Sequence, residues 1–414
     1  MTKVAVLGGG MVGVCCALAL QRSGVNVTLI DRRPPGRETS YGNAGVVARS
    51  SLMPLNNPGL WKTLPKMLSN RTASLRYNIP FLLRNMGWVI GFLANARAKP
   101  FSETTAALDA LIRCSDTEHL RLLDEAGATG RLTDKGWIFL YRSGAGYDGA
   151  ALGRETFDHF GLETETIDKA GLNDLEPSLK PVFEKALWIK SAHSIDNPGG
   201  LVEDYARLFA SRGGIICETP LQKLEQEGSR WTVVEEDGTR SVWDKVVVAL
   251  GPWSKQFLGR MGIKVPMGFE RGYHMHYESV GNARLGRPIY DTARGYVLSP
   301  MAQGLRLTTG VELNDCDAPA NPAQLRMAVT SAREAFPVGE ALEETPWLGR
   351  RPTLPDSRPI IGEAPERRGL WLAFGHQHIG FSTGPGTARL LTELMTGAKT
   401  VIDPHPFRAA RFIR

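Results

Sequence analysis

The chain has 414 residues, of which 42% are hydrophobic and 22% are charged, a balance that is usual for globular proteins and excludes a disordered or fibrous chain. The net charge is +6, but the Lys and Arg residues are spread along the chain, so the charge does not imply a nucleic-acid partner. The five cysteines form no CxxC pair, which excludes a zinc ribbon, argues against a disulfide framework and indicates the reduced cytoplasm.

The N-terminal segment predicts a βαβ unit. Residues 4–7 form a continuous apolar run, which is typical of a strand buried on both faces. A glycine-rich turn follows at 8–13, and then an apolar helix at 14–20. A second strand is expected at 25–30, ending at Asp31.

The rest of the chain predicts helices and strands without a linker between halves. We expect a loop at 34–60 and helices across 60–125, with boundaries at Pro65, Pro80 and Pro100. Further strands are expected at 135–141, 186–190, 215–217, 231–235, 245–250 and 370–374, with several antiparallel strands across 270–313. Further helices are expected at 200–211, at 322–336 with Asn321 as N-cap, and at 387–396, stopped by Gly397. The sequence therefore indicates interleaved domains.

Two segments match the GxGxxG pattern, Gly8–Gly13 and Gly144–Gly149. At the first, the apolar helix that follows can point unpaired backbone N–H groups at a pyrophosphate. Gly10 then allows the backbone to approach the phosphate, and Gly13 allows close contact between helix and strand. In the second, Asp148 would repel a phosphate. We therefore predict a dinucleotide site at the first segment and a solvent-exposed loop at the second.

Asp31 stands at the end of the second strand, where a carboxylate can accept hydrogen bonds from the adenosine ribose. A carboxylate at this position disfavours a 2′-phosphate, so NADP is not expected. The glycines themselves do not choose between NAD and FAD.

Four further segments carry a family resemblance. They are the small-residue loop Thr39–Gly45, the strand and turn Val246–Ser254 with its A-x-G-x-W ending, the G-x-R-P…D-x-x-P-x-I-G pattern over 349–362, and the G-H-x-x-x-G segment Gly375–Ser382. In this order and spacing they resemble the D-amino-acid oxidase/glycine oxidase superfamily of FAD-dependent enzymes. The most similar branch is that of bacterial D-amino-acid dehydrogenases, including D-hydroxyproline dehydrogenase-like members.

The resemblance implies a mixed α/β fold, in which a Rossmann-like FAD-binding domain is interleaved with a substrate domain of antiparallel sheet and helices. We expect residues 1–48, 191–258 and 344–414 in the FAD-binding domain, and 49–190 and 259–343 in the substrate domain.

Non-covalent FAD is expected. Some relatives attach the flavin through a histidine near the first glycine motif or a cysteine after the R-P pattern. The matching stretches here hold Tyr41-Gly42 and Thr353-Leu354.

The resemblance also implies a set of cofactor-binding residues from these segments. They are Gly8, Gly10, Met11, Val12, Gly13, Asp31, Arg32, Arg33, Ser40, Asn43, Ala44, Gly45, Leu221, Ala249, Gly251, Trp253, Gly375, His376, Gly380, Phe381, Ser382 and Thr383. Backbone N–H groups of residues 375–383, near the start of the last helix, are expected to stabilise negative charge on the reduced flavin.

The implied reaction is hydride transfer from the α-carbon of a D-amino acid or cyclic imino acid to the flavin N5, giving an imine that hydrolyses to a keto acid. Arg351 matches the family's carboxylate-binding position, and a guanidinium suits that role because it holds a carboxylate in a two-pronged fork. A structural ion pair, or Arg350 in its place, is the alternative. For a hydroxyl donor we favour Tyr273 and then Tyr296, against the alternative that each is an aromatic side chain on a half-buried sheet.

Two alternating histidine pairs, His274 with His276 and His376 with His378, suggest a metal site. Because no carboxylate stands at a supporting spacing, we expect no metal. One of the four, with His378 as the catalytic candidate, is expected to line the substrate pocket; otherwise they are ordinary sheet and loop histidines.

Residues 79–96 are apolar on more than one face, and the uncharged run between Arg84 and Arg97 is too short to span a bilayer, which needs about 20 residues. The simpler interpretation is packing on the protein or on another subunit of a homo-oligomer. The alternative is a peripheral contact with the inner face of the cell membrane, where a quinone or respiratory chain accepts electrons and where Arg84, Arg97 and Lys99 suit anionic lipid.

Two other functions stay open at this stage. One is a glycine/sarcosine-type amine oxidase that uses O2. The other is a flavoprotein subunit that passes electrons without a free substrate of its own.

Overall fold

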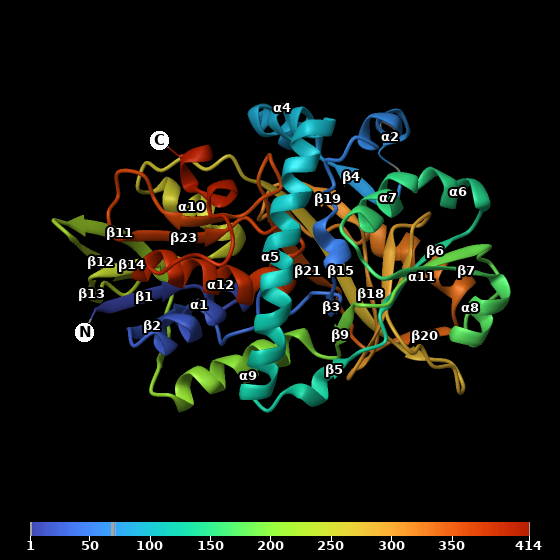
Figure 1. The fold of residues 1–414 in the computed structure, drawn as a ribbon, viewed down its shortest axis with the longest axis horizontal. Helices are drawn as coiled ribbons and strands as arrows, with labels where there is room; N and C mark the ends of the chain where they lie inside the picture. Colours follow the sequence, from blue (N-terminus) through green and yellow to red (C-terminus); the bar gives the residue numbers. More distant parts are fainter. Residues whose placement is uncertain (1, 68–69, 71, 414) are drawn as a thin grey trace.

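The computed structural model describes residues 2–67, 70 and 72–413, and it contains two large sheets that lie side by side. In Figure 1, the long helix α5 (Ala98–Glu125) runs across the view between the six-stranded sheet on the left and the 11-stranded sheet on the right. The mixed α/β fold expected from the sequence is confirmed.

The six-stranded sheet has the order β10-β2-β1-β14-β23-β22. Its strands are β1 (Lys3–Leu7), β2 (Asn26–Asp31), β10 (Ile215–Glu218), β14 (Lys245–Val248), β22 (Ile360–Glu363) and β23 (Leu370–Phe374). All neighbours are parallel except β22 and β23. The chain moves from β1 to β2 on one side, while β14 flanks β1 on the other, and such a switch in strand order opens a crevice at the carboxyl ends of the strands.

Both faces of this sheet are covered, which explains its continuous apolar strands. Helices α1 (Met11–Arg22), α9 (Pro198–Ser211) and α12 (Gly380–Thr396) pack on one face with α5. The hairpin strands β11 (Leu221–Glu227), β12 (Arg230–Glu235) and β13 (Arg240–Trp243) form a small sheet that contributes to the hydrophobic cluster on the other face.

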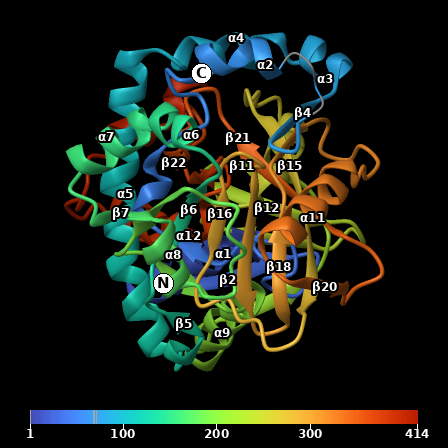
Figure 2. The same cartoon turned by 90° about the vertical axis from the view of Figure 1, so that its right-hand side faces the viewer.

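The 11-stranded sheet is centred on β15 (Gly268–Ser279), which pairs with β18 (Gly304–Thr308), β19 (Val311–Leu313), β20 (Val338–Ala341) and β21 (Trp347–Thr353). Its other strands are β4 (Leu75–Tyr77), β6 (Trp137–Tyr141), β7 (Thr164–Asp168), β8 (Lys185–Ile189), β16 (Ile289–Asp291) and β17 (Tyr296–Met301). Helix α11 (Ala323–Ala335) packs against one face, as Figure 2 shows.

Some predicted elements differ from the structure. The predicted loop 34–60 contains the short strand β3 (Val46–Val47) and a 3₁₀ turn at Arg49–Leu52, while β4 interrupts the helices expected across 60–125. Those helices are α2 (Leu60–Met67), α3 (Ile79–Arg84), α4 (Met86–Asn95) and α5, and the expected segment also includes residues 68, 69 and 71, which lie outside the described residues. Pro80 and Pro100 lie in first helical turns, but Pro65 lies inside α2.

The last long helix begins earlier than predicted, at Gly380 instead of Thr387. Gly384 and Gly386 disfavour a helix by local propensity, so the sequence did not predict this earlier start. The structure explains why both positions hold glycine. A Cβ at Gly384 would lie 2.7 Å from the Met11 Cγ, and one at Gly386 would lie 2.7 Å from the Leu111 carbonyl oxygen of α5. Tertiary packing therefore requires residues that disfavour a helix by local propensity.

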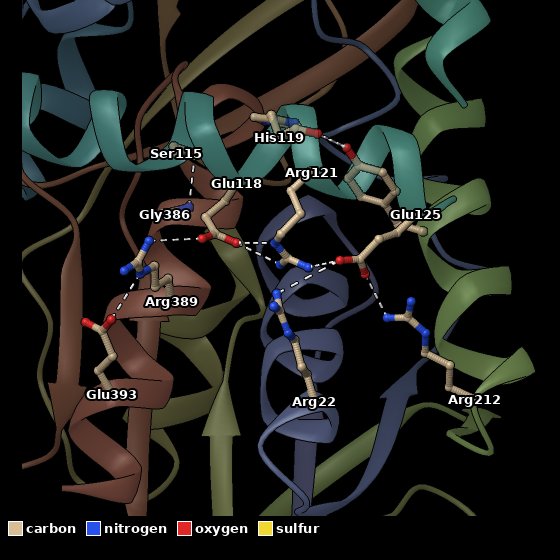
Figure 3. Close-up of polar contacts among 11 residues, drawn as sticks. Arg22, Ser115, Glu118, His119, Arg121, Glu125, Arg212, Gly386, Arg389 and Glu393 are labelled. Carbon is tan, nitrogen blue, oxygen red and sulfur yellow. Dashed lines mark hydrogen bonds and ion pairs between the residues drawn. The ribbon is translucent and has the colours of Figure 1, made fainter. Parts of the chain in front are cut away.

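Helix α5 holds α12 and α1 in place through a polar network (Figure 3). The Ser115 hydroxyl donates to the Ser382 carbonyl at 2.6 Å. It accepts from the Gly386 N–H at 3.0 Å, the contact drawn in Figure 3. Arg389 of α12 contacts Glu118 at 3.1 Å, and Glu118 also accepts from Arg121. The start of α12 is thus fixed relative to the sheet.

His119 is the buried titratable group of this part of α5. Its Nε2 lies 2.9 Å from the Phe381 carbonyl oxygen, and its Nδ1 lies 3.4 Å from the Tyr205 hydroxyl. Burial lowers the pKa of His119 from its ordinary value of 6.5 to about 4, because the interior disfavours the charged imidazole.

We predict a pH-dependent stability term from His119. The folded state favours the neutral ring, so this term is present in full above pH 6.5 and is lost as the pH falls toward about 4. At about pH 5 the loss should be about 2 kcal/mol. Other buried histidines act in the same direction, so denaturant unfolding of wild type and His119→Gln at about pH 7.5 and about pH 5 isolates the term. An equal pH dependence in both proteins would contradict the assignment.

Candidate active site

The first glycine turn joins β1 to α1 at the carboxyl edge of the six-stranded sheet. Gly8 has φ +117°, a conformation that side chains rarely adopt. A Cβ at Gly13 would lie 1.8 Å from the Gly8 carbonyl oxygen, so the helix packs against the turn more closely than any other residue would allow. Gly10 is the N-cap of α1 and has no side chain with which to cap it, while the Met11 N–H donates to the Ser40 hydroxyl at 2.9 Å. The positive end of α1 is therefore available to an anion.

Asp31 lies against this turn from the end of β2. Its Oδ2 accepts from the Gly9 N–H at 2.5 Å, and its Oδ1 accepts from the Arg33 N–H at 3.1 Å. Burial raises the pKa of Asp31, while these two hydrogen bonds oppose the shift. Each oxygen keeps a lone pair with which it can accept a ribose hydroxyl.

We predict that Asp31→Ala weakens FAD binding by about 1–3 kcal/mol, because it removes a buried acceptor. Titration of apoprotein with FAD, followed by fluorescence quenching, measures the change. Asp148→Ala is the matched control, since that carboxylate belongs to the second glycine segment and should not affect FAD. Equal affinities of wild type and Asp31→Ala would move the adenosine site elsewhere.

The second glycine segment forms the short helix α6 (Gly144–Gly149), and its backbone donors are already used. The Gly144 N–H donates to the Glu184 carboxylate at 2.7 Å, and the Gly146 N–H donates to the Ser143 hydroxyl at 3.2 Å. A carboxylate where a phosphate would bind leaves this segment unsuitable for a nucleotide.

The loop that follows β2 returns to the start of α1. The Ser40 hydroxyl accepts from the Met11 N–H at 2.9 Å, and the Asn43 side chain accepts from the Gly45 N–H at 2.8 Å. Ala44 lies between these turns and is half-buried. The start of α12 reaches the same place, because a Cβ at Gly380 would lie 3.9 Å from the Val12 Cγ2. Two helix N-termini and a small-residue loop therefore converge.

Two hydrogen bonds and one buried side chain fix the start of α12. The Ser382 hydroxyl donates to the Val46 carbonyl at 3.1 Å, the Thr383 hydroxyl donates to the Ile379 carbonyl at 2.9 Å, and Phe381 is buried. Gly375 has φ +89° at the end of β23, and a Cβ there would meet Leu354 at 2.6 Å.

The other predicted cofactor residues gather beside the end of β2. Ala249 and Gly251 follow β14, and Ala249 packs its carbonyl against Gly8. The Arg32 guanidinium lies 4.3 Å from the ring centroid of Trp253, and both Arg32 and Arg33 pair with Glu38. Leu221 begins β11 soon after Thr219, whose N–H donates to the Asp31 carbonyl at 2.8 Å.

These residues fit FAD on the evidence of the chain itself. The Gly8–Gly13 turn is a cradle that a Cβ would fill, the N-terminus of α1 with its glycine N-cap suits a pyrophosphate, and Asp31 suits a ribose. When bound, FAD would supply the hydride acceptor, which the side chains of a protein lack.

Arg351 lies on the face of β21 opposite α11, where β15 and β21 pair Glu270 with Arg351 and Gly272 with Gly349. Its guanidinium lies over the backbone of Gly272, since a Cβ there would be 2.5 Å from the Arg351 Nη2. The Nη1 makes a long contact of 3.5 Å with the Gly310 carbonyl. Among the residues that the structure describes, no carboxylate lies within ion-pair distance of Arg351. The fork is therefore available to a carboxylate from outside the chain.

Arg350 is directed elsewhere, as expected for adjacent residues of a strand. Its Nε donates to the Cys316 carbonyl at 2.7 Å, and its guanidinium lies 6.0 Å from the Trp253 ring centroid.

Tyr273 and Tyr296 do not meet Arg351, and this corrects the expectation that they complete its carboxylate clamp. Both belong to the hydrophobic cluster under α11, on the other face of the sheet. The Tyr273 hydroxyl donates to Glu312 at 2.9 Å and accepts from the Asn321 N–H at 2.7 Å. Adjacent strand residues alternate faces, so a tyrosine between Gly272 and His274 points away from them.

The four histidines separate into different environments. His376 is buried, and its Nε2 lies 2.9 Å from the Thr387 hydroxyl, so the ring contacts the following helix α12. His378 lies near Arg351: burial, and then the Arg351 charge, lower the pKa of His378 to about 4. His274 stacks on Trp347 at 4.8 Å between ring centroids. Over the described part of the chain, no group of three His, Cys, Asp or Glu is placed to hold a metal.

The sequence did not indicate Arg306, which ties the 11-stranded sheet to the loop at 40–45. This buried guanidinium donates to the carbonyls of Tyr41 at 2.9 Å and Asn43 at 2.6 Å, and its Nε donates to the His276 Nε2 at 3.0 Å. Because Nε2 accepts, the proton of neutral His276 is on Nδ1, which contacts Glu343. In the sequence Arg306 stands between Leu305 and Leu307, an alternation that is typical of a strand but does not indicate that the arginine is buried.

Comparison with known proteins identifies the family. The family model described as FAD dependent oxidoreductase matches residues 3–394. The chain belongs to this family. It is 29% identical to a D-amino-acid oxidase of Bradyrhizobium diazoefficiens, over 99% of both chains, and 29% identical to a D-amino acid dehydrogenase of Sinorhizobium medicae, over 99% of this chain and 100% of the relative.

Solved structures show the same fold. The glycine oxidase of Geobacillus kaustophilus superposes with a TM-score of 0.75 at 21% identity and full coverage of both chains. The L-proline dehydrogenase of P.horikoshii gives a TM-score of 0.76 at 18% identity, covering 99% of this chain and 97% of that one. This FAD-dependent oxidoreductase therefore shares its architecture with amine-oxidising enzymes, and the family expected from the sequence is confirmed.

Proposed function

We propose that this enzyme oxidises a D-amino acid or a cyclic imino acid and works as a dehydrogenase. The observation that carries the proposal is the position of the Arg351 guanidinium. It lies near His378 on the face of the 11-stranded sheet opposite α11, and it has no carboxylate partner among the described residues. A partly buried guanidinium left unpaired suits a carboxylate ligand. The names of the relatives favour D-amino acids within that class.

The residues divide the work as follows in this proposal. Arg351 holds the substrate carboxylate, which fixes the α-carbon, and the neutral His378 beside it adds no second positive charge. The Gly8–Gly13 turn and Asp31 hold the dinucleotide, while the N-terminus of α12 favours negative charge on the cofactor. The remaining cofactor residues predicted from the sequence, and the division into interleaved FAD and substrate domains, stay part of the proposal.

The binding of FAD is proposed to be non-covalent, because Tyr41-Gly42 and Thr353-Leu354 occupy the positions where some relatives attach it. Acid precipitation should then release FAD into the supernatant. Flavin that stays with the precipitated protein would contradict non-covalent binding.

An anaerobic screen of D- and L-amino acids tests the substrate class. We expect D-amino acids or cyclic imino acids to bleach the flavin absorbance of the holoenzyme, and their L-enantiomers to do so far more slowly. Peroxide yield in air then separates a dehydrogenase from an oxidase, the activity in the name of the Bradyrhizobium relative. Absence of bleaching by every amino acid would overturn the proposal.

The electron acceptor is proposed to be a membrane quinone or a respiratory chain, reached through the exposed apolar face of α3 and α4. Ile79, Leu83 and Ile90 are 60%, 63% and 61% exposed, and Arg97 and Lys99 lie beside them. Figures 1 and 2 both place α2 and α4 together along one edge of the molecule. No helix in the described ranges is long and apolar enough to cross a bilayer.

We predict that Leu83→Asp with Ile90→Asp reduces binding to anionic lipid vesicles by about tenfold or more, because both side chains would otherwise enter the interface. Co-sedimentation measures the bound fraction. Val242→Asp, at another exposed apolar residue, is the control. If wild type does not bind vesicles and instead forms a dimer that the double variant loses, the face is a subunit contact.

A further inference from the structure

A second charged group shares the sheet face of Arg351. Glu270 of β15 is the direct cross-strand partner of Arg351, so both side chains leave the sheet on the same side. Glu270 is 1% exposed, although glutamate is almost never fully buried unless it is paired.

The two carboxylate oxygens of Glu270 are in different situations. Oε1 accepts from the Thr353 hydroxyl at 2.7 Å, which fixes the orientation of the carboxylate. Oε2 is buried and, in the described part of the structure, has no hydrogen-bond partner. A buried acceptor without a partner costs about 1–3 kcal/mol, so a ligand that donates a hydrogen bond to Oε2 would remove this cost.

Glu270 and Arg351 do not neutralise each other directly. No contact within 4.0 Å joins them, although they are adjacent across the strands, and the Arg351 fork turns toward Gly272 and Gly310 instead. One free positive fork and one free negative oxygen thus lie on neighbouring strands. An α-amino acid carries the complementary pair of charges on a single carbon.

We propose that Glu270 is the group that recognises the substrate's amino nitrogen, with Oε2 accepting its N–H while Arg351 holds the carboxylate. This inference rests on the proposed function and adds to it a specificity-determining residue. It explains why the site would select amino acids over simple carboxylic acids of the same shape.

The same contact supplies a proton acceptor. An amino acid arrives as an ammonium, and its nitrogen must be neutral before its lone pair can assist loss of hydride from the α-carbon. One proton passes from the ammonium nitrogen to the Glu270 Oε2. The N–H bond breaks and its electron pair stays on nitrogen, while an O–H bond forms on Glu270, so neither group is oxidised or reduced. Burial raises the pKa of Glu270, which favours this uptake.

The test compares wild type with Glu270→Gln, which keeps the shape and an oxygen for Thr353 but cannot take the proton. Anaerobic flavin reduction by the best amino acid is measured against concentration and pH. The affinity for the deamino analogue, a plain carboxylic acid with the same side chain, is measured by its perturbation of the flavin spectrum. Glu312→Gln is the matched control, because that buried glutamate lies with Tyr273 on the other face.

We expect the apparent Kd of the amino acid to rise about tenfold or more in Glu270→Gln, and its pH profile to move toward the pH at which the free amine is neutral. The Kd of the deamino analogue should change by less than about threefold. Glu270→Asp keeps a carboxylate but withdraws it by one carbon, so it should keep the wild-type pH profile while raising the Kd of the amino acid more than that of the deamino analogue. This change in the ratio of the two Kd values is the test if the Gln variant does not fold.

The results distinguish an error in the role of Glu270 from an error in the proposed function. If amino acids bleach the wild type but Glu270→Gln shows the same affinity and pH profile as Glu312→Gln, Glu270 does not recognise the amine and the proposed function stands. The same conclusion follows if Glu270→Asp leaves the ratio of the two Kd values, amino acid to deamino analogue, at its wild-type value. If no amino acid bleaches the wild type, the proposed function and this inference both fall.

Discussion

Arg351→Lys should lower kcat/KM for the amino-acid substrate, and the fall should correspond to a loss of about 2–5 kcal/mol in transition-state binding. The flavin spectrum should stay nearly unchanged. A lysine keeps the charge but loses the two-pronged fork, so the carboxylate is no longer held at two points and the α-carbon is no longer fixed. Steady-state kinetics measure the effect, and FAD content shows that the cofactor site is intact. The loss should be larger for amino acids than for simple amines of similar shape.

Arg350→Lys is the matched control, because its neighbouring guanidinium is directed to the Cys316 carbonyl and Trp253. It should retain most of the activity. A larger loss in Arg350→Lys than in Arg351→Lys would show that the wrong arginine has been chosen. If neither change mattered, the substrate would not be an amino acid.

Gly13→Ala should abolish or strongly weaken FAD binding. The new Cβ would lie 1.8 Å from the Gly8 carbonyl oxygen, a backbone atom that cannot rotate away, so α1 must move off the turn. Overpacking in rigid surroundings costs about 1–3 kcal/mol or more, and here the displaced helix N-terminus is the proposed phosphate site. The protein should purify with little flavin.

Gly153→Ala provides the control for Gly13→Ala, because a Cβ there meets nothing within 4 Å. Circular dichroism separates loss of FAD from loss of fold. Full flavin content in Gly13→Ala would contradict the close packing of α1 on the turn.

Local pattern was sufficient for the elements of the proposed cofactor site. The apolar runs of β1 and β2, the glycines between them and Asp31 are determined within one short segment, where periodicity and turn chemistry agree. The second glycine match was predicted to be a solvent-exposed loop, but the structure shows the short helix α6 there, with the Glu184 carboxylate bound at its N-terminus.

The substrate face could not be predicted as well, because it depends on strand register. Tyr273 was expected beside Arg351, but the register of β15 with β21 places Glu270 and Gly272 on that face instead. A shift of one residue moves every side chain to the other face, and nothing in the local sequence sets this register. The start of α12 was hidden for a related reason, since Gly384 and Gly386 are required by packing against other helices.

In the proposed reaction the enzyme removes hydride from the α-carbon of an amino acid. Stopped-flow reduction of the holoenzyme without oxygen, using the best D-amino acid with hydrogen or deuterium at that carbon, tests this step. We expect one equivalent of the amino acid to bleach the flavin completely and to yield one keto acid, and we expect deuterium to slow the bleaching. If dithionite reduces the flavin but no amino acid does, the enzyme does not carry out this reaction.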